Sequence, residues 1–450
     1  MDITFFGASH QVTGSCHLVS TKGKSILFDC GMFQGSDFNE GRNHDNFSFD
    51  PKTIDTVLVS HAHTDHSGRI PKLIKDGFVG KLYMTKGTLE LSRIVWEDAY
   101  HIMVYNNRKF QSPILFTPDD ITVAYENTIA VDYNTTLDLG SGISAVFKDA
   151  GHIFGSSFIE VSDGDTTIAY SGDVGNVDVP ILRNTAQLGD IDVLLCESTY
   201  GDRVHESRRD REQIFTDLIM EGVKRGGTIM MPAFSLERTQ EILYVLNEMF
   251  AENPALPKIP IFLDSPMAIR ATEVYKNHPE YYDAEAAKKY SLGEDFFSFP
   301  NLTCTLSKEE SIRINSVKGP KLVIAGSGMM NGGRILHHAK RYLSDERSML
   351  VIVGYQAHNT LGRKLYEGAK HVTIHNERVS VRAKVTAIGA LSAHADKNQL
   401  IRWVSDAKTV PKTVFCVHGE AVPSTTLAHS LRDSLAIEAF VPEEGEKFTV

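Results

Sequence analysis

The sequence predicts an α/β protein in which one α/β domain is inserted into another, β-rich domain. The chain has 450 residues, which is more than one hydrophobic core usually holds, so two domains are expected. Residues 1–206 show short strand-like runs, residues 207–368 alternate strands with helices, and strand-like alternation returns over residues 369–450. A β-rich pattern on both sides of an α/β segment is typical of an inserted domain.

Composition places the chain among ordinary globular proteins, with 42% hydrophobic and 23% charged residues. The net charge of −11 argues against a broad basic face for nucleic acid, but a local groove remains compatible with it. Five cysteines without a C-x-x-C pair indicate a reducing compartment and no disulfide framework. The chain shows no signal peptide and no apolar run of about 20 residues, so we expect a cytoplasmic protein with no membrane contact.

The first domain is expected to consist mainly of short strands that end at Gly, Asp or Pro. The predicted strands are residues 3–6, 25–29, 56–60, 81–84, 145–150, 158–161, 166–171 and 193–196, with helices over 70–75 and 89–103.

The second domain is expected to be built from βαβ units around a parallel sheet. Its predicted helices are residues 208–225, 236–250 and 334–343, and its strands are 228–232, 259–263, 321–325 and 349–353. Beyond it, residues 379–388 and 413–417 are predicted as strands.

The segment His61-Ala62-His63-Thr64-Asp65-His66 directly follows the predicted strand 56–60. In an extended chain residues 61, 63 and 65 point to one side, while His66 begins a helix-like segment and diverges. Nitrogen and oxygen ligands that converge on two neighbouring points suit two zinc ions. A solvated polar loop is the alternative, but three histidines and an aspartate within six positions favour a metal site.

Two more ligand candidates stand at strand ends, His152 in Gly151-His152-Ile153 and Asp173 in Ser171-Gly172-Asp173. A carboxylate between two zinc ions can bridge them, and Asp173 is the candidate for this role.

These elements, with Asp29 in Phe28-Asp29-Cys30-Gly31, resemble the metallo-β-lactamase superfamily in type and order. Glu197-Ser198-Thr199-Tyr200-Gly201, Ser392-Ala393-His394-Ala395-Asp396 and Val417-His418-Gly419-Glu420 extend the likeness to the β-CASP nucleases, and to bacterial and archaeal relatives of the endonuclease subunit of the cleavage and polyadenylation specificity factor. The resemblance implies a metallo-β-lactamase αββα sandwich over residues 1–206 and 369–450, with a β-CASP α/β domain inserted over 207–368.

The same resemblance implies a role for each residue. His61, His63 and His152 would hold one zinc ion, Asp65, His66 and His418 the other, and Asp173 would bridge them. Glu197 would orient His394 or a ligand, and His394 would act as general acid. Asp29 would orient a ligand histidine. A histidine at position 418 goes with RNA-processing members, so RNA is favoured over DNA.

A glycine-rich loop over residues 326–333 lies between a predicted strand and a predicted helix. Its backbone amides at Ser327, Gly328 and Met329 are candidates for phosphate binding, as are Arg238 and Arg363. Asn331 replaces the third glycine of G-x-G-x-x-G, so a dinucleotide site is not indicated. Close packing of strand and helix, or ion pairs of the arginines, are the alternatives.

The sequence thus predicts a zinc-dependent ribonuclease with two zinc ions, acting on single-stranded RNA in processing or decay and leaving 5′-phosphate and 3′-hydroxyl ends. It would be an endonuclease, with 5′ exonuclease activity also compatible, and a homodimer is compatible with the sequence. The alternatives are a DNA nuclease of the same group, a small-molecule metallo-hydrolase and a non-catalytic RNA-binding scaffold.

Overall fold

A computed structural model of the chain describes all residues except 36, 206–210, 254, 355, 358 and 389–391. The described residues form two compact units, one made of Met1–Val204 and His394–Val450 and the other of His205–Ala393. The start of the helix predicted over 208–225 therefore lies outside the described residues.

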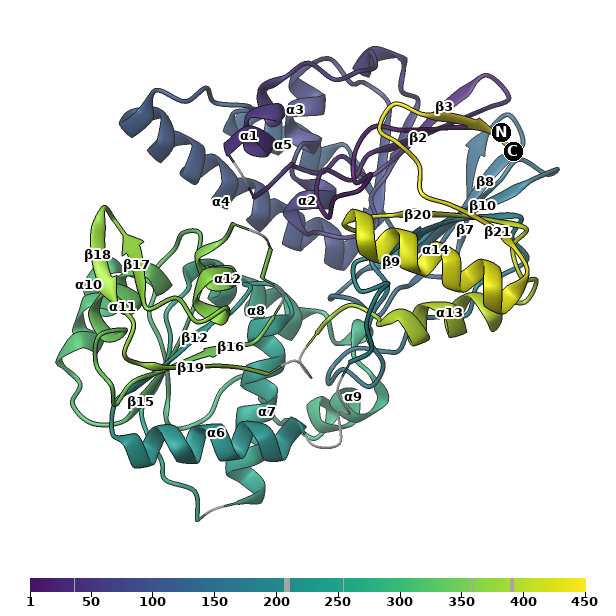
Figure 1. Cartoon of the computed structure of the whole chain (residues 1–450). Coiled ribbons are helices and arrows are strands. Elements are labelled where there is room, and N and C mark those ends of the chain that lie inside the picture. The colour runs from purple at the N-terminus through teal and green to yellow at the C-terminus, as the bar shows by residue number, and fades with distance from the viewer. Residues whose placement is uncertain (36, 206–210, 254, 355, 358, 389–391) are drawn as a thin grey trace. The chain divides into compact units, whose positions relative to one another are not determined.

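The first unit contains two seven-stranded sheets, with the strand orders β22-β1-β2-β3-β4-β5-β6 and β21-β20-β11-β10-β9-β8-β7 (Figure 1). The first sheet consists of β1 (Asp2–Phe5), β2 (His17–Thr21), β3 (Lys24–Phe28), β4 (Thr56–Leu58), β5 (Lys81–Thr85), β6 (Thr128–Val131) and β22 (Lys447–Thr449). The second sheet consists of β7 (Thr136–Gly140), β8 (Ile143–Asp149), β9 (Ser157–Ser162), β10 (Thr167–Tyr170), β11 (Val193–Glu197), β20 (Thr413–Val417) and β21 (Glu438–Phe440).

The inner faces of the two sheets share one hydrophobic core. Phe5 and Phe28 from the first sheet and Phe147 and Phe415 from the second are all fully buried in it. The rings of Phe5 and Phe415 lie 5.3 Å apart across this core. The alternation of inward and outward side chains along each strand explains why short alternating runs predicted these strands.

Helices cover the outer face of each sheet. On the first sheet lie α1 (Asp37–Gly41), α2 (Thr64–Ser67), α3 (Ile70–Lys75), α4 (Lys86–Phe110) and α5 (Pro118–Glu126), and on the second α13 (Lys397–Ser405) and α14 (Ala421–Leu435). Trp96 of α4 packs in a cluster with Val57, and Trp403 of α13 packs 5.3 Å from the ring of Phe158. The order helix, sheet, sheet, helix confirms the predicted αββα sandwich.

The second unit has a six-stranded sheet in the order β14-β13-β15-β12-β16-β19, in which every pair is parallel. Its strands are β12 (Thr228–Pro232), β13 (Ile261–Leu263), β14 (Leu302–Cys304), β15 (Lys321–Ala325), β16 (Met349–Ile352) and β19 (Lys384–Ala387). Its helices are α6 (Arg211–Arg225), α7 (Arg238–Glu252), α8 (Pro266–Asn277), α9 (Ala284–Ser291), α10 (Lys308–Arg313), α11 (Ile335–Tyr342) and α12 (Leu361–Tyr366). This arrangement confirms the predicted α/β character with a parallel sheet.

The single strand predicted over 379–388 is wrong, because the structure has two strands there. β18 (Glu377–Ser380) forms a hairpin with β17 (His371–Ile374), whereas β19 joins the large sheet beside β16. Both strands lie in the second compact unit. The three-part division at 206/207 and 368/369 stays a prediction. Among the described residues no helix is long and apolar enough to cross a bilayer.

Candidate metal centre

Three of the predicted site residues lie at one edge of the second sheet. β10, β11 and β20 are neighbouring parallel strands, so their carboxyl ends lie side by side. Asp173 follows β10, Glu197 ends β11 and His418 follows β20, and all three side chains are buried. Polar residues at these three strand ends therefore meet at one place.

The first sheet supplies the histidine-rich segment to the same place. β4 leads through two buried residues to His61, and His63 is the residue before α2, whose first turn carries Asp65 and His66. The backbone amide of His66 donates to the carbonyl of His63, which closes this turn. The short helix directs both Asp65 and His66 away from His61 and His63. The divergence of His66 was expected, whereas the extended-chain pattern placed Asp65 on the side of His61 and His63. That placement of Asp65 is wrong, because residues 64–67 are helical.

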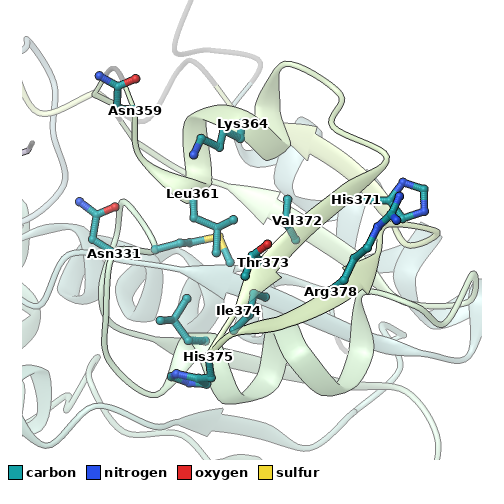
Figure 2. Close-up of a pocket in the computed structure, with 12 residues that line it drawn as sticks. Asn331, Asn359, Leu361, Lys364, His371, Val372, Thr373, Ile374, His375 and Arg378 are labelled. Atoms are coloured by element: carbon teal, nitrogen blue, oxygen red, sulfur yellow. The ribbon is translucent and has the colours of Figure 1, made fainter.

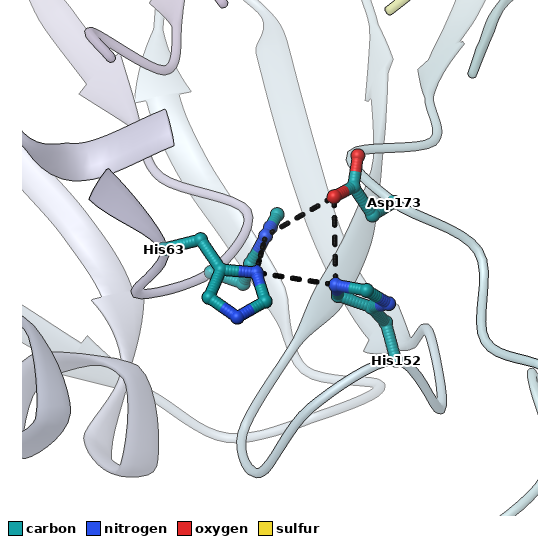
Figure 3. Close-up of side chains that lie close together, drawn as sticks. His63, His152 and Asp173 are labelled. Atoms are coloured by element: carbon teal, nitrogen blue, oxygen red, sulfur yellow. Dashed lines mark hydrogen bonds and ion pairs between the residues drawn. The ribbon is translucent and has the colours of Figure 1, made fainter. Parts of the chain in front are cut away.

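Figure 3 shows one cluster, in which His63, His152 and Asp173 point toward one another. Nδ1 of His63 lies 3.1 Å from Nε2 of His61 and 3.2 Å from Nε2 of His152. Oδ2 of Asp173 lies 3.4 Å from Nε2 of His61 and 3.4 Å from Nε2 of His152. These four residues have the spacing of a group that could hold a metal ion.

A second cluster lies on the other side of Asp173. Nε2 of His66 lies 3.1 Å from Nε2 of His418, and Oδ2 of Asp65 lies 3.5 Å from that same His418 atom. Oδ1 of Asp173 is 3.3 Å from Nε2 of His66 and 3.4 Å from Nδ1 of His418. Asp65, His66 and His418 also have the spacing of a metal-binding group.

Both clusters fit a tetrahedral zinc ion. Two nitrogens bound to one zinc at about 2.0–2.1 Å lie about 3.3 Å apart, close to the nitrogen–nitrogen distances above. In the described part of the chain, Oδ1 of buried Asp173 accepts no hydrogen bond, although it faces the second cluster. A buried carboxylate oxygen without a donor is costly unless a cation fills the place.

Histidines that bind a metal must be free of protons, and three of the candidate ligands meet this condition before a metal binds. Burial lowers the pKa of His63 to about 3, and burial also lowers the pKa values of His61 and His152. Burial raises the pKa values of Asp65 and Asp173, but the neighbouring histidines outweigh it and hold both below their usual range. His66 differs from these three histidines, because the carboxylates of Asp173 and Asp29 outweigh burial and hold its pKa well above the usual value. Binding of a metal at Nε2 of His66 would therefore release a proton.

Asp29 lies behind the second cluster and accepts several hydrogen bonds there. Its carboxylate accepts hydrogen bonds from Nδ1 of His66 at 2.7 Å and from the Tyr170 hydroxyl at 2.7 Å. It also accepts from the backbone amide and the hydroxyl of Ser60, both at 2.6 Å. Since Asp29 takes Nδ1, Nε2 of His66 faces the centre. Tyr170 and Ser60 were not among the predicted site residues, because their only signal in the sequence was a position at strand ends next to predicted ligands.

Glu197 and His394 form a third group at the centre. Nδ1 of His394 lies 3.0 Å and 3.2 Å from the two carboxylate oxygens of Glu197 and 3.9 Å from Oδ2 of Asp173. Glu197 also accepts from the backbone amide of Val174 at 2.8 Å, which fixes its carboxylate. The geometry therefore brings together every predicted metal-ligand candidate with Glu197, His394 and Asp29.

Thr199 was missed by the sequence analysis. Its hydroxyl lies 3.2 Å from Nδ1 of His418 and donates to the carbonyl of the same residue at 3.1 Å. The contact to Nδ1 leaves Nε2 of His418 directed toward His66. Its position in Glu197-Ser198-Thr199, beside a predicted catalytic residue, was the available signal.

The predicted phosphate contacts lie in the second unit, where the backbone amide of Gly362, next to Arg363, donates to the carbonyl of Met329 at 3.1 Å. Arg238 is buried in an ion pair with Glu241, and Arg363 pairs with Glu367 at 2.6 Å. Ser327, Gly328 and Met329 lie in the loop between β15 and α11, where the carbonyl of Gly328 accepts from Nε2 of Gln356 at 2.9 Å. Phosphate binding by these residues stays a prediction.

Three family models match successive parts of the chain. The Metallo-beta-lactamase superfamily matches residues 11–200, the Beta-Casp domain matches 239–365, and the Zn-dependent metallo-hydrolase RNA specificity domain matches 378–442. The middle match falls inside the second unit, and the outer two contain the predicted ligands.

Several named proteins align with nearly the whole chain. Ribonuclease TTHA0252 of Thermus thermophilus is 40% identical over 420 residues, covering 93% of each chain. The RNase J-like protein of Methanocaldococcus jannaschii is 32% identical over 98% of both chains. Integrator complex subunit 11 of Danio rerio is 30% identical over 100% of this chain and 74% of its own. A solved structure of a protein of unknown function from Enterococcus faecalis shares the fold over 100% of this chain and 99% of its own, with a TM-score of 0.56 and 15% identity.

Proposed function

Because the chain belongs to the β-CASP ribonuclease group of the metallo-β-lactamase superfamily, we propose that it hydrolyses phosphodiester bonds of single-stranded RNA at a centre of two zinc ions. The products would carry 5′-phosphate and 3′-hydroxyl ends. The observation that carries the proposal is the placement of Asp173, whose two carboxylate oxygens face two separate histidine clusters.

We assign His61, His63 and His152 to one ion, and Asp65, His66 and His418 to the other, with Asp173 shared. When bound, zinc would lower the pKa of a water toward about 7 and neutralise charge on the phosphate oxygens. The assigned ligands include only two carboxylates, so the loaded site keeps a net positive charge. A positive site favours an anionic phosphodiester over a neutral small-molecule substrate.

His394 is assigned as the general acid. Burial lowers its pKa, but the negative charges of Glu197 and Asp173 outweigh burial and raise it to about 9. Glu197 holds Nδ1 of this imidazole. Nε2 is then the atom that would give a proton to the departing 3′ oxygen of the ribose. Glu197 acts through His394 and is a positioning residue.

Metal analysis and cleavage of one labelled RNA test the proposal. Purified protein should contain two zinc ions per chain, and Asp65→Ala and His394→Ala should each abolish cleavage. His429→Ala is the matched control, because His429 is exposed on α14 and lies outside the centre. Cleavage by Asp65→Ala at the wild-type rate would contradict the mechanism. DNA of the same sequence separates a ribonuclease from a DNA nuclease. Light scattering, compared with the chain mass of 49.9 kDa, shows whether the protein is a monomer or a homodimer.

A further inference from the structure

A cavity of about 590 Å³ in the second unit takes no part in the chemistry above. Figure 2 shows it between the loop after β15, the start of α12 and the hairpin β17–β18. Its lining includes Asn331 from the loop, Lys364 from α12, His371 and Thr373 from β17 and Arg378 from β18. Polar and cationic side chains from three separate segments therefore meet at one surface.

The hairpin directs its polar side chains to a single face. Val372, Ile374 and Val379 are buried in the core of the unit, so the alternate residues of the two strands face solvent. Thr373 is the cross-strand partner of Arg378, which places these two side chains on the same face beside His371. The strand period thus accounts for the polar lining.

The two cationic side chains that line this cavity form no ion pairs among the described residues, unlike cationic side chains close to them in the same unit. Arg363 pairs with Glu367 and Lys340 with Glu377, whereas Lys364 and Arg378 have no ion-pair partner among the residues that the structure describes. No carboxylate lines the cavity within that part of the chain. The chain has a net charge of −11, but these two positive charges have no ion-pair partner among the described residues. They therefore favour binding of an anion at this cavity.

We propose that this cavity binds the phosphodiester backbone of the RNA strand as a contact additional to the metal centre, an inference that rests on the proposed function. Lys364 and Arg378 would contact phosphates, and the exposed ring of His371 offers a surface on which a base can stack. A small-molecule site usually buries about 70–90% of its ligand. Here Lys364, His371 and Arg378 are all exposed, which favours a strand whose ends continue beyond the cavity.

The test measures RNA binding by full-length Asp65→Ala protein, in which cleavage is expected to be abolished. A fluorescent 20-nucleotide single-stranded RNA is titrated at several salt concentrations, with and without Lys364→Gln and Arg378→Gln together. Each lost phosphate contact should reduce the slope of log K against log salt by about 0.7, so the double change should reduce it by about 1.4 and weaken binding about tenfold at low salt. Lys318→Gln removes a charge that is also exposed but lies outside the cavity, and it should leave the slope unchanged.

Circular dichroism of each variant, compared with the Asp65→Ala parent, checks that the variants are folded. A salt slope and affinity that change no more than with Lys318→Gln would overturn the inference. So would binding of adenosine monophosphate that depends on Arg378 while binding of RNA does not, because a free nucleotide would then be the ligand. Failure of the proposed function would be separate, since wild-type protein would then fail to cleave RNA whether or not Arg378 contributes to binding.

Discussion

At the scale of single residues, the centre depends on side chains that never touch the metal positions. The carboxylate of Asp29 accepts hydrogen bonds from Ser60, Tyr170 and His66. Its carboxylate therefore selects the ring orientation of His66 that leaves Nε2 for a metal, as outer carboxylates do in zinc sites. Thr199 holds His418 in a similar way.

Asp29→Asn should weaken zinc binding about 10- to 100-fold, because the amide nitrogen of asparagine would face donors and release His66. Competition with a fluorescent chelator measures the change. Asp165→Asn, an exposed change in the same unit, should leave zinc affinity at the wild-type value. Equal affinity in the Asp29→Asn and wild-type proteins would remove Asp29 from the support of the centre.

His17 gives a prediction about pH. It is fully buried between Phe5 and Tyr170, neither ring nitrogen has a hydrogen-bond partner among the described residues, and burial lowers its pKa to about 3. The unfolded chain takes up a proton near pH 6.5, whereas the folded protein does so only near pH 3. Stability from neutral His17 is thus full above pH 6.5 and is lost as the pH falls toward 3.

Between pH 7 and pH 4 the free energy of unfolding should therefore fall less in His17→Phe than in the wild type. The difference between the two decreases should be about 3 kcal/mol. Denaturant unfolding at a series of pH values gives the difference between the two proteins. Replacing exposed His429 with Phe should reproduce the wild-type pH dependence. Parallel pH curves for wild type and His17→Phe would show that His17 does not titrate in this way.

At the scale of elements, the sequence predicted what local pattern determines. Strands 228–232, 321–325 and 413–417 have the predicted bounds, and the ligand candidates stand where their strands end. The prediction of one continuous strand over residues 379–388 was wrong, because apolar residues alternate through this segment without interruption. The break comes from Leu343, whose carbonyl accepts the amides of Arg382 and Ala383, and no local period reveals that distant partner.

Some site residues could likewise be predicted from a local sequence pattern, whereas others could be recognised only in the folded structure. The six-residue cluster from His61 to His66 has its own sequence signature, and the residues at strand ends gained meaning beside it. Tyr170, Ser60 and Thr199 have side chains common in any strand end or turn. Their contacts link the end of β3 to β4 and β10, and the end of β11 to β20, so single-sequence patterns could not distinguish them.

Gly31 tests the placement of α2. A Cβ atom added there would lie 1.6 Å from the carbonyl oxygen of Asp65, far inside van der Waals contact. Gly31→Ala should therefore displace α2, with loss of at least one zinc ion per chain and a lower unfolding midpoint. Gly41→Ala is the control, because a Cβ there meets nothing within 4 Å. Normal zinc content in Gly31→Ala, measured by atomic emission, would show that α2 tolerates the shift.

At the scale of the whole molecule, both ends of the chain complete the first unit. β22 pairs with β1, and β20 lies between β11 and β21 in the second sheet. His394 and His418 come from the segment that follows the second unit. The centre thus requires residues that precede the second unit and residues that follow it. The second unit therefore separates these residues widely in the sequence.

The first unit should fold without the second. The backbone amide of Lys397 donates to the carbonyl of Arg203 at 3.1 Å, so the chain leaves and re-enters the first unit at nearby points. A short glycine-serine linker between Val204 and His394 can therefore replace residues 205–393 with little cost of loop closure. Both metal clusters, Glu197 and His394 remain in such a protein.

The shortened protein should bind two zinc ions and hydrolyse bis(p-nitrophenyl) phosphate, a small phosphodiester that needs only the centre. Its KM for a 20-nucleotide RNA should rise at least tenfold, because contacts made by the second unit are lost while chemistry at the centre is retained. The same protein with His394→Ala should lose both activities. An unfolded or zinc-free product would mean that the second unit also stabilises the first, and an unchanged KM for RNA would mean that the first unit alone binds the substrate.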